Sequence, residues 1–253
     1  MESHRQQILD QFTRQALPFA TSPGIRSEET LHLILELTNA DSADTTLDVA
    51  CGPGLIVCAF ARVVRHATGI DITPAMLDRA RQEADARNLT NATWKLGDVG
   101  ALPYTDGSFT IVTSRYAFHH IQDPLSVLRE MHRVCAPGGR VALIDSSPLS
   151  EKADAFNRME KLRDPSHVRA MPMEELRELF KKAGLSNPQT TTYRLKGDLD
   201  GLLSRSFPNS GDDLKIRQLF ETSLSNDPLD MELKRDGDRI LYGHPTSVLV
   251  STR

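Results

Sequence analysis

Long hydrophobic runs, an apolar core near the first residues and an even number of cysteines are all missing from this sequence of 253 residues. No run approaches the roughly 18 apolar residues that a membrane span needs, so we expect no transmembrane segment. The opening stretch, MESHRQQILDQFTRQ, is polar and lacks the apolar core of a secretory signal. The three cysteines are odd in number and lie in expected strand, turn and helix segments. We therefore expect reduced core thiols in a cytoplasmic protein.

An excess of basic charge and a metal-ligand spacing are missing as well. The formal net charge is -4 and no Cys-x-x-Cys pair occurs. This balance gives no reason to expect nucleic acid as a partner, and we expect no metal site. The remaining composition, with 39% hydrophobic and 25% charged residues, is that of an ordinary globular protein. The length allows one large domain or two small ones, and the absence of a linker favours one.

Strand-like and helix-like segments alternate through the first 150 residues. Because such alternation favours a parallel sheet covered by helices on both faces, we predict a doubly wound α/β fold. The expected strands cover residues 45–51, 66–72, 92–99, 109–116 and 140–147, and the helices between them cover 54–64, 73–88 and 123–139. Further helices are expected over 29–39, 150–164, 172–185 and 213–225, and further strands over 190–198 and 240–252.

A glycine-rich turn, Cys51-Gly52-Pro53-Gly54, joins the first expected strand to the following helix. Gly52 and Gly54 allow a tight turn and the close approach of a ligand. The third glycine of the dinucleotide pattern is replaced by Val57, and Pro53 removes an N–H group that a pyrophosphate would use. The turn therefore favours a ligand without phosphate, or a tight turn without any ligand.

Two acidic residues lie at the ends of the next two expected strands. Asp71 ends the second strand, where a carboxylate can accept both hydroxyl groups of a ribose. Asp98 ends the third strand, where a carboxylate can accept an adenine amino group. Each alone is also typical of a helix N-cap or a surface acid. Three ligand-type features at successive strand ends together indicate a nucleoside-like ligand.

The segments TLDVACGPG, GIDITPAML and the run from Gly97 to Asp145 resemble, in order, the motifs of class I S-adenosylmethionine-dependent methyltransferases. The nearest resemblance is to the small-molecule branch that includes the ubiquinone and menaquinone C-methyltransferases, whose cofactor is S-adenosyl-L-methionine. It implies a Rossmann-like, seven-stranded, mostly parallel sheet with an antiparallel last strand and helical insertions. Within a single domain, 1–253, it implies a helical lid over 1–44, a cofactor-binding core over 45–146 and acceptor-pocket helices and final strands over 147–253.

The resemblance also implies cofactor-binding residues. It assigns the methionine part to the glycine turn, the ribose to Asp71 and the adenine to the ends of the second and third strands. Phe19 stands where a tyrosine is frequent in the family. The cofactor-binding residues expected on this basis are Gln15, Phe19, Ser22, Ala50, Gly52, Gly54, Asp71, Ile72, Met76, Asp98, Val99, Ser114 and Arg115. Gln15 and Ser22 are equally compatible with polar positions on an exposed helix and loop.

Chemistry is expected in SRYAFHHIQDP, after the fourth strand. The stretch is similar to one in phosphoethanolamine methyltransferases, where a catalytic histidine matches His120. Because neighbouring side chains should diverge, we expect at most one of His119 and His120 to face the methyl group. His120 is the favoured base and His119 the second candidate, and either is also compatible with a structural role. The acceptor-binding residues expected are Tyr116, His167 and Arg169.

The expected function is methyl transfer to a small organic acceptor through an oxygen, nitrogen, carbon or sulfur nucleophile. The alternative is an S-adenosylmethionine-binding protein that does not methylate, either a cyclase or a binding module. An RNA or protein methyltransferase is disfavoured because there is no basic stripe and no Asn/Asp-Pro-Pro-Tyr/Phe motif. A metal-dependent catechol-type enzyme is disfavoured because no acidic cluster follows the fifth strand.

Overall fold

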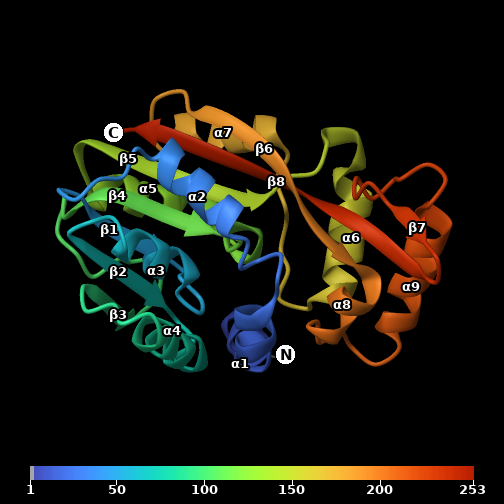
Figure 1. Cartoon of the computed structure of the whole chain (residues 1–253). Helices are drawn as coiled ribbons and strands as arrows, with labels where there is room; N and C mark the ends of the chain where they lie inside the picture. Colours follow the sequence, from blue (N-terminus) through green and yellow to red (C-terminus); the bar gives the residue numbers. More distant parts are fainter. Residues whose placement is uncertain (1–2) are drawn as a thin grey trace.

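The computed structural model describes residues 3–253, and within them eight strands form one sheet (Figure 1). Seven strands lie side by side in the order β3-β2-β1-β4-β5-β8-β6, and the short β7 pairs with β8. The strands are β1 (Thr45–Val49), β2 (His66–Asp71), β3 (Ala92–Leu96), β4 (Phe109–Arg115), β5 (Cys135–Ser146), β6 (Gln189–Asp198), β7 (Lys234–Asp236) and β8 (Arg239–Thr252).

Strands β1 to β5 pair in parallel, and β8 runs antiparallel to both β5 and β6. The Rossmann-like sheet with an antiparallel C-terminal strand is therefore confirmed. The eighth strand, β7, was not expected from the sequence. Its three residues are exposed and form a short hairpin with β8, so they carry no buried apolar pattern.

The helices are α1 (His4–Thr21), α2 (Glu28–Leu37), α3 (Leu55–Ala61), α4 (Pro74–Ala86), α5 (Pro124–Val134), α6 (Ala153–Arg163), α7 (Met173–Lys182), α8 (Leu199–Ser204) and α9 (Asp212–Ser223). Short 3-10 turns cover Phe118–His120 and Ser150–Lys152. Side-chain caps explain several starts: Ser27 accepts from the N–H of Thr30, and Asp123 accepts from that of Ser126. No helix within residues 3–253 is long and apolar enough to cross a membrane.

Helix α5 ends earlier than the expected stop at Gly138 and Gly139. It ends at Val134, and β5 begins at Cys135 with an irregular register against β4. Gly138 has φ +74, in the left-handed region. A Cβ on Gly139 would lie 2.7 Å from the sulfur of Cys135, so the turn requires glycine. The glycines therefore belong to the strand's entry and do not end the helix.

Three large apolar clusters hold the layers together. One face of the sheet packs against α5 and α7 through residues such as Leu128 and Phe180, and the other packs against α2 and α3 through Ile34 and Phe60. A third cluster joins α6, α8 and α9 to the end of β8 that extends beyond β5. Burial of these side chains is the main stabilising term of the fold.

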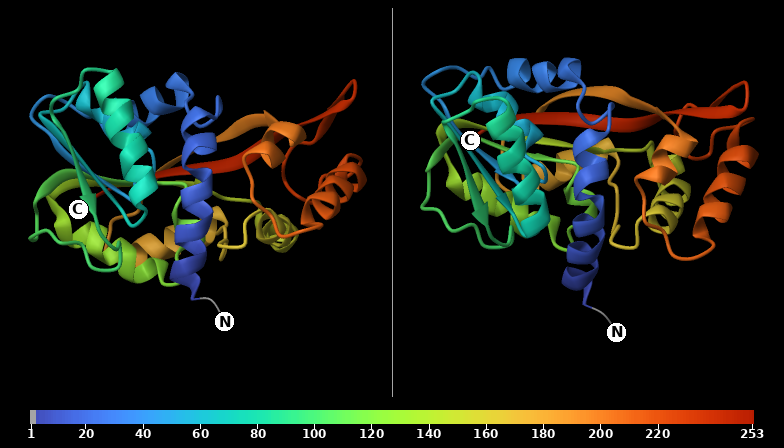
Figure 2. Two further views of the ribbon diagram at one scale, coloured as in Figure 1. Left: turned by 90° about the horizontal axis from the view of Figure 1, so that it is seen from below. Right: turned by 60° about the horizontal axis from the view of Figure 1, so that its bottom comes forward.

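Helix α1 crosses the carboxyl ends of the parallel strands. In both views of Figure 2 it stands between α4 on one side and the group formed by α6, α8 and α9 on the other. It thus lies between the two parts of the chain that border the site described below.

Candidate active site

A cavity of about 390 Å³ opens at the carboxyl ends of β1, β2 and β4, beneath α1. Its volume is in the range of small-molecule sites, and its position is the usual ligand site of a doubly wound sheet. Nine of the thirteen cofactor-binding residues expected from the sequence line it: Phe19, Ala50, Gly52, Asp71, Ile72, Met76, Asp98, Val99 and Arg115. We call this space the cofactor cavity.

The glycine turn and the end of β2 are joined by hydrogen bonds to one carboxylate. Asp71 accepts from the backbone N–H groups of Gly52 and Thr73, each at 2.8 Å. Burial raises the pKa of Asp71, and the two backbone donors oppose that rise. A Cβ on Gly52 would meet only the Met76 sulfur, at 3.9 Å, so the missing side chain leaves room in the cavity. This arrangement fits a ribose beside Asp71.

Gly54 does not line the cofactor cavity. A Cβ there would lie 2.5 Å from the ring of Trp94 and 2.8 Å from the Cβ of Ala80. Its φ of +76 is also in the left-handed region. Gly54 therefore allows the first turn of α3 to pack against α4 and β3, which differs from the ligand contact that its motif position suggested.

A smaller space of about 20 Å³ is bordered by Phe19 and Tyr116. Its lining also includes one carboxyl group, that of Asp48, and one guanidinium group, that of Arg115. Asp48 is buried on β1 and accepts from the hydroxyl of Thr113 at 2.7 Å. Burial raises the pKa of Asp48 to about 7. Arg115 donates to the carbonyl of Ile25 at 2.7 Å, while its buried Nε has no partner. An acid and a cation side by side fit an amino acid's ammonium and carboxylate groups.

Three other expected residues are also absent from the lining of the cofactor cavity. Ser114 donates its hydroxyl to the carbonyl of Val49 at 2.8 Å, which ties β4 to β1. Ser22 is the C-cap residue of α1 and is buried. Gln15 is also buried, and its amide donates to Asp164 at 2.8 Å. These side chains are used in joining elements, a role that sequence spacing does not distinguish from ligand binding.

A second cavity, of about 80 Å³, adjoins the first and is called the acceptor cavity below. Phe12, Phe19, Tyr116 and His120 line both cavities, so the two meet at these side chains. Eleven further residues line the acceptor cavity but not the cofactor cavity: Gln15, Ile25, His119, Ser146, Arg163, Asp164, Leu195, Leu202, Arg205, Tyr242 and His244. The expected acceptor-binding residue Tyr116 thus lies at the junction, with a φ of +55.

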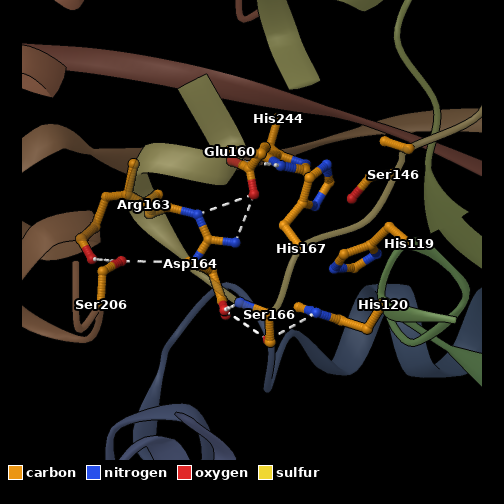
Figure 3. Close-up of polar contacts among 12 residues, drawn as sticks. His119, His120, Ser146, Glu160, Arg163, Asp164, Ser166, His167, Ser206 and His244 are labelled. Carbon is orange, nitrogen blue, oxygen red and sulfur yellow. Dashed lines mark hydrogen bonds and ion pairs between the residues drawn. The ribbon is translucent and has the colours of Figure 1, made fainter. Parts of the chain in front are cut away.

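His120 is held by a hydrogen-bonded chain, shown in Figure 3. Its Nδ1 lies 3.0 Å from the Ser166 hydroxyl, which in turn donates to Asp164 at 2.6 Å. Because the serine proton points to Asp164, we assign the Nδ1 proton to His120, which leaves Nε2 free to accept. Burial lowers the pKa of His120 to about 4, so the ring is neutral at pH 7.

His119 has a carboxylate of its own. Its Nδ1 lies 2.5 Å from Asp145, which also accepts from the His119 backbone N–H at 3.1 Å. Burial acts to lower the pKa of His119, but the charge and hydrogen bond of Asp145 produce a net rise. The two histidine rings lie 4.2 Å apart and both line the acceptor cavity, because the 3-10 turn keeps them on one side. The expectation of diverging side chains is therefore wrong, although only His120 also reaches the cofactor cavity.

His167 and Arg169, expected to bind the acceptor, do not line the acceptor cavity. The Nε2 of His167 lies 2.7 Å from the side-chain oxygen of Asn157, and the ring borders a separate surface hollow. Arg169 is half-exposed and pairs with Glu175 at 2.6 Å. The same RDPSHVR segment instead supplies Arg163 and Asp164 to the cavity lining and Ser166 to the chain that holds His120. The sequence analysis did not single out these three residues.

Helix α1 contacts both cavities and residues around them. Arg5 pairs with Asp98 at 2.9 Å, at the mouth of the cofactor cavity. His4 hydrogen-bonds the carbonyl of His120 at 2.8 Å, and Gln15 binds Asp164 at the far end. The helix thereby covers the junction where the two cavities meet.

A doubly wound sheet with a nucleoside-sized cavity at its switch point defines a nucleoside-cofactor enzyme class, and the comparisons with known proteins name the family. Residues 47–143 match the methyltransferase domain family. The chain is 30% identical over 196 residues to YcgJ, an uncharacterized methyltransferase of Bacillus subtilis, covering 77% of this chain and 78% of that protein. This chain therefore belongs to the S-adenosylmethionine-dependent methyltransferases, and its cofactor is S-adenosylmethionine.

Three further likenesses are shorter in sequence or rest on structure. A demethylmenaquinone methyltransferase of Lactobacillus johnsonii is 36% identical over 110 residues, which cover 42% of this chain and 45% of that protein. The crystal structure of YcgJ superimposes with a TM-score of 0.82 at 24% identity, covering 89% of this chain and 98% of that chain. The [4+2]-cyclase SpnF superimposes with a TM-score of 0.61 at 18% identity, covering 89% and 80%, respectively. The last two likenesses show the fold.

Proposed function

We propose that this chain transfers a methyl group to a small organic acceptor bound in the acceptor cavity. The observation that carries the proposal is the junction of the two cavities at Phe12, Phe19, Tyr116 and His120. A donor in one cavity and an acceptor in the other would meet at these side chains. Positioning two reactants in this way is the main contribution that such an enzyme can make.

The side chains around the cofactor cavity and the smaller space beside it support a binding role for each part of the cofactor. The Asp71 carboxylate would accept the ribose hydroxyl groups, while Ile72 and Val99 would border the adenine ring. Asp48 and Arg115 would pair with the ammonium and carboxylate of the methionyl part. When bound, the cofactor would supply an electrophilic methyl group on its sulfonium, and the sulfur would leave as a neutral thioether when the acceptor's nucleophile bonds to that carbon.

His120 would act as the base when the acceptor must lose a proton. Its free Nε2 can take that proton, and the Ser166–Asp164 chain stabilises the imidazolium that results. Ring burial keeps His120 neutral before reaction. The apolar rings of Phe12 and Phe19 exclude water from the junction, which strengthens each electrostatic contact there.

The division of the chain into three parts is part of the proposal. Residues 1–44 would act as the lid, because α1 lies over the junction of the cavities. Residues 45–146 would bind the cofactor, and 147–253 would supply most of the remaining acceptor cavity. The demethylmenaquinone methyltransferase likeness covers 42% of this chain, so it does not define the acceptor.

The test combines cofactor binding with product release. Calorimetry should show binding of S-adenosylmethionine, and a panel of small phenols, amines and thiols should yield release of S-adenosylhomocysteine with at least one of them. Binding without release for every acceptor would favour the non-methylating alternative, which the fold shared with a [4+2]-cyclase keeps relevant. Failure to bind S-adenosylmethionine would refute the assignment of the cavity.

A further inference from the structure

The part of the acceptor cavity that does not border the cofactor cavity carries two guanidinium groups. Arg163 and Arg205 line it, together with Tyr242 and His244. The carboxylate in its lining, Asp164, accepts three hydrogen bonds, from Gln15 and from the backbone and hydroxyl of Ser166. Its acceptor capacity is therefore largely used within the protein.

The two guanidinium groups differ in their partners. Arg163 is clamped on Glu160, with Nε and Nη2 donating to the same carboxylate oxygen at 2.9 and 2.5 Å. Figure 3 shows this pair above the Asp164–Ser166–His120 chain. The remaining Nη1 of Arg163 has only a long contact, 3.5 Å, to the Ser206 hydroxyl. Arg163 is thus neutralised by its neighbour but keeps one donor weakly used.

Arg205 has no carboxylate within 4.0 Å in the described part of the chain. Its Nη2 donates to the Tyr242 hydroxyl at 2.5 Å, and its Nη1 donates to the carbonyl of Gly201. Both contacts are to neutral groups, which orient the guanidinium without compensating its charge. The Asp198 carboxylate lies on the other side of Gly201, near Arg205 but beyond ion-pair distance. A half-buried cation that makes no ion pair favours an anion in the adjoining space.

A second polar group in the same lining also lacks a partner. His244 is 9% exposed, and its Nε2 faces Glu160 at 3.7 Å. Its other ring nitrogen, Nδ1, is buried without a hydrogen bond. A buried polar atom is normally satisfied, so an unsatisfied one in a cavity wall indicates a polar ligand. Both observations therefore point to a polar ligand at this end of the cavity, and the charge of Arg205 selects an anionic one.

We propose that the methyl acceptor is a small anionic compound whose carboxylate or phosphate group is bound by Arg205. The proposal rests on the function proposed above. The acid group would lie between Arg205 and the free donor of Arg163, and the nucleophile would point to His120 at the junction. Tyr242 acts as a positioning residue because it fixes the guanidinium, whose planar donors match a carboxylate or phosphate.

In the test, matched probes are titrated into the protein loaded with S-adenosylhomocysteine, and ligand-observed NMR measures the affinity of each probe. Salicylate carries a carboxylate, phenyl phosphate carries a phosphate, and phenol is the neutral reference. We expect the better of the two anions to bind at least tenfold more tightly than phenol. Whichever anion binds better identifies the acid group. Equal affinity for phenol and both anions would overturn the proposal.

Variants assign the preference to Arg205. Arg205→Gln should weaken the preferred anion by roughly 10- to 100-fold, the effect of losing hydrogen bonds to a charged group, with phenol within twofold. Arg205→Lys should recover part of the loss. The matched control is Arg217→Gln, because Arg217 lies on α9 and pairs with Asp200 at 2.7 Å, outside the cavity. An unchanged anion preference in Arg205→Gln would overturn the proposal.

Tyr242→Phe keeps the charge of Arg205 and provides a milder test should Arg205→Gln fold poorly. It should weaken binding of the anion several-fold and leave the affinity for phenol unchanged. Equal losses of affinity for both probes would count against the proposal. Failure of the methyltransferase assignment is a separate result. That failure would show as absent S-adenosylhomocysteine binding, whereas bound S-adenosylhomocysteine with no anion preference would reject only the anionic acceptor.

Discussion

Gly54→Ala should destabilise the fold far more than it changes the cofactor cavity. The new Cβ would lie 2.5 Å from Trp94 and 2.8 Å from Ala80, closer than packed carbon atoms tolerate. Relieving such overpacking costs about 1–3 kcal/mol, and a left-handed φ costs about 1–2 kcal/mol for a residue other than glycine. The sum, about 2–5 kcal/mol, corresponds to a melting temperature lower by roughly 4–20 °C in a chain of this size.

Gly52→Ala is the matched control, because it shares the left-handed backbone but has open space. It should lose only the backbone contribution of about 1–2 kcal/mol, or roughly 2–8 °C. Its Cβ would occupy cofactor space, so S-adenosylhomocysteine should bind roughly tenfold or more weakly, a cost of the size of local overpacking. Thermal melting and calorimetry measure both effects. If Gly54→Ala melts like the wild type but loses cofactor affinity, the separate roles assigned to the two glycines are wrong.

Asp71→Ala should weaken S-adenosylmethionine by roughly 2–4 kcal/mol in calorimetry, because two hydrogen bonds to a buried carboxylate are lost; Asp78→Ala, on the exposed face of α4, should have no effect. His120→Ala should lower kcat by roughly 10²–10⁴ for a hydroxyl acceptor with cofactor affinity within a few-fold, and near-normal turnover would make the histidine structural. Because the pKa of His120 is lowered to about 4, the base is neutral above that pH and is lost below it. The acid limb of kcat/KM should therefore lie near pH 4 and vanish in His120→Ala. Backbone amides of residues 12–22 should exchange hydrogen more slowly once both ligands are bound, and equal rates would rule out the lid.

The cofactor cavity was largely predictable because its residues follow consecutive parallel strands. Asp71 is the last residue of β2, Asp98 lies two residues beyond the end of β3, and Ala50 directly follows β1. The carboxyl ends of neighbouring parallel strands meet at one edge of a sheet, so positions near in the strand pattern become near in space. Asp48 was missed as a site residue because its side chain lies within the buried strand, where a carboxylate gives no ligand signal of its own.

The acceptor cavity was less predictable because distant segments form it. Arg163, Arg205 and His244 are widely separated in the sequence and meet only through the packing of α6 and α8 on β8. Local patterns carry no information on such contacts. Arg169, in the segment that was expected to bind the acceptor, lies at the surface and pairs with Glu175 in the first turn of α7.

Helix α1 links these two kinds of site, and its contacts differ in strength from one end to the other. The Arg5–Asp98 pair is exposed on both sides, so it contributes no more than about 1 kcal/mol. The Gln15–Asp164 hydrogen bond is buried and made to a charged group, a type that contributes about 1.5–3 kcal/mol. The N-terminal end, whose other contact is the part-buried hydrogen bond between His4 and the His120 carbonyl, lies over the cofactor cavity. The end held by Gln15 lies over the acceptor cavity. On the lid proposal, opening of α1 from its N-terminal end should uncover the cofactor cavity at lower cost than it uncovers the Asp164–Ser166–His120 chain.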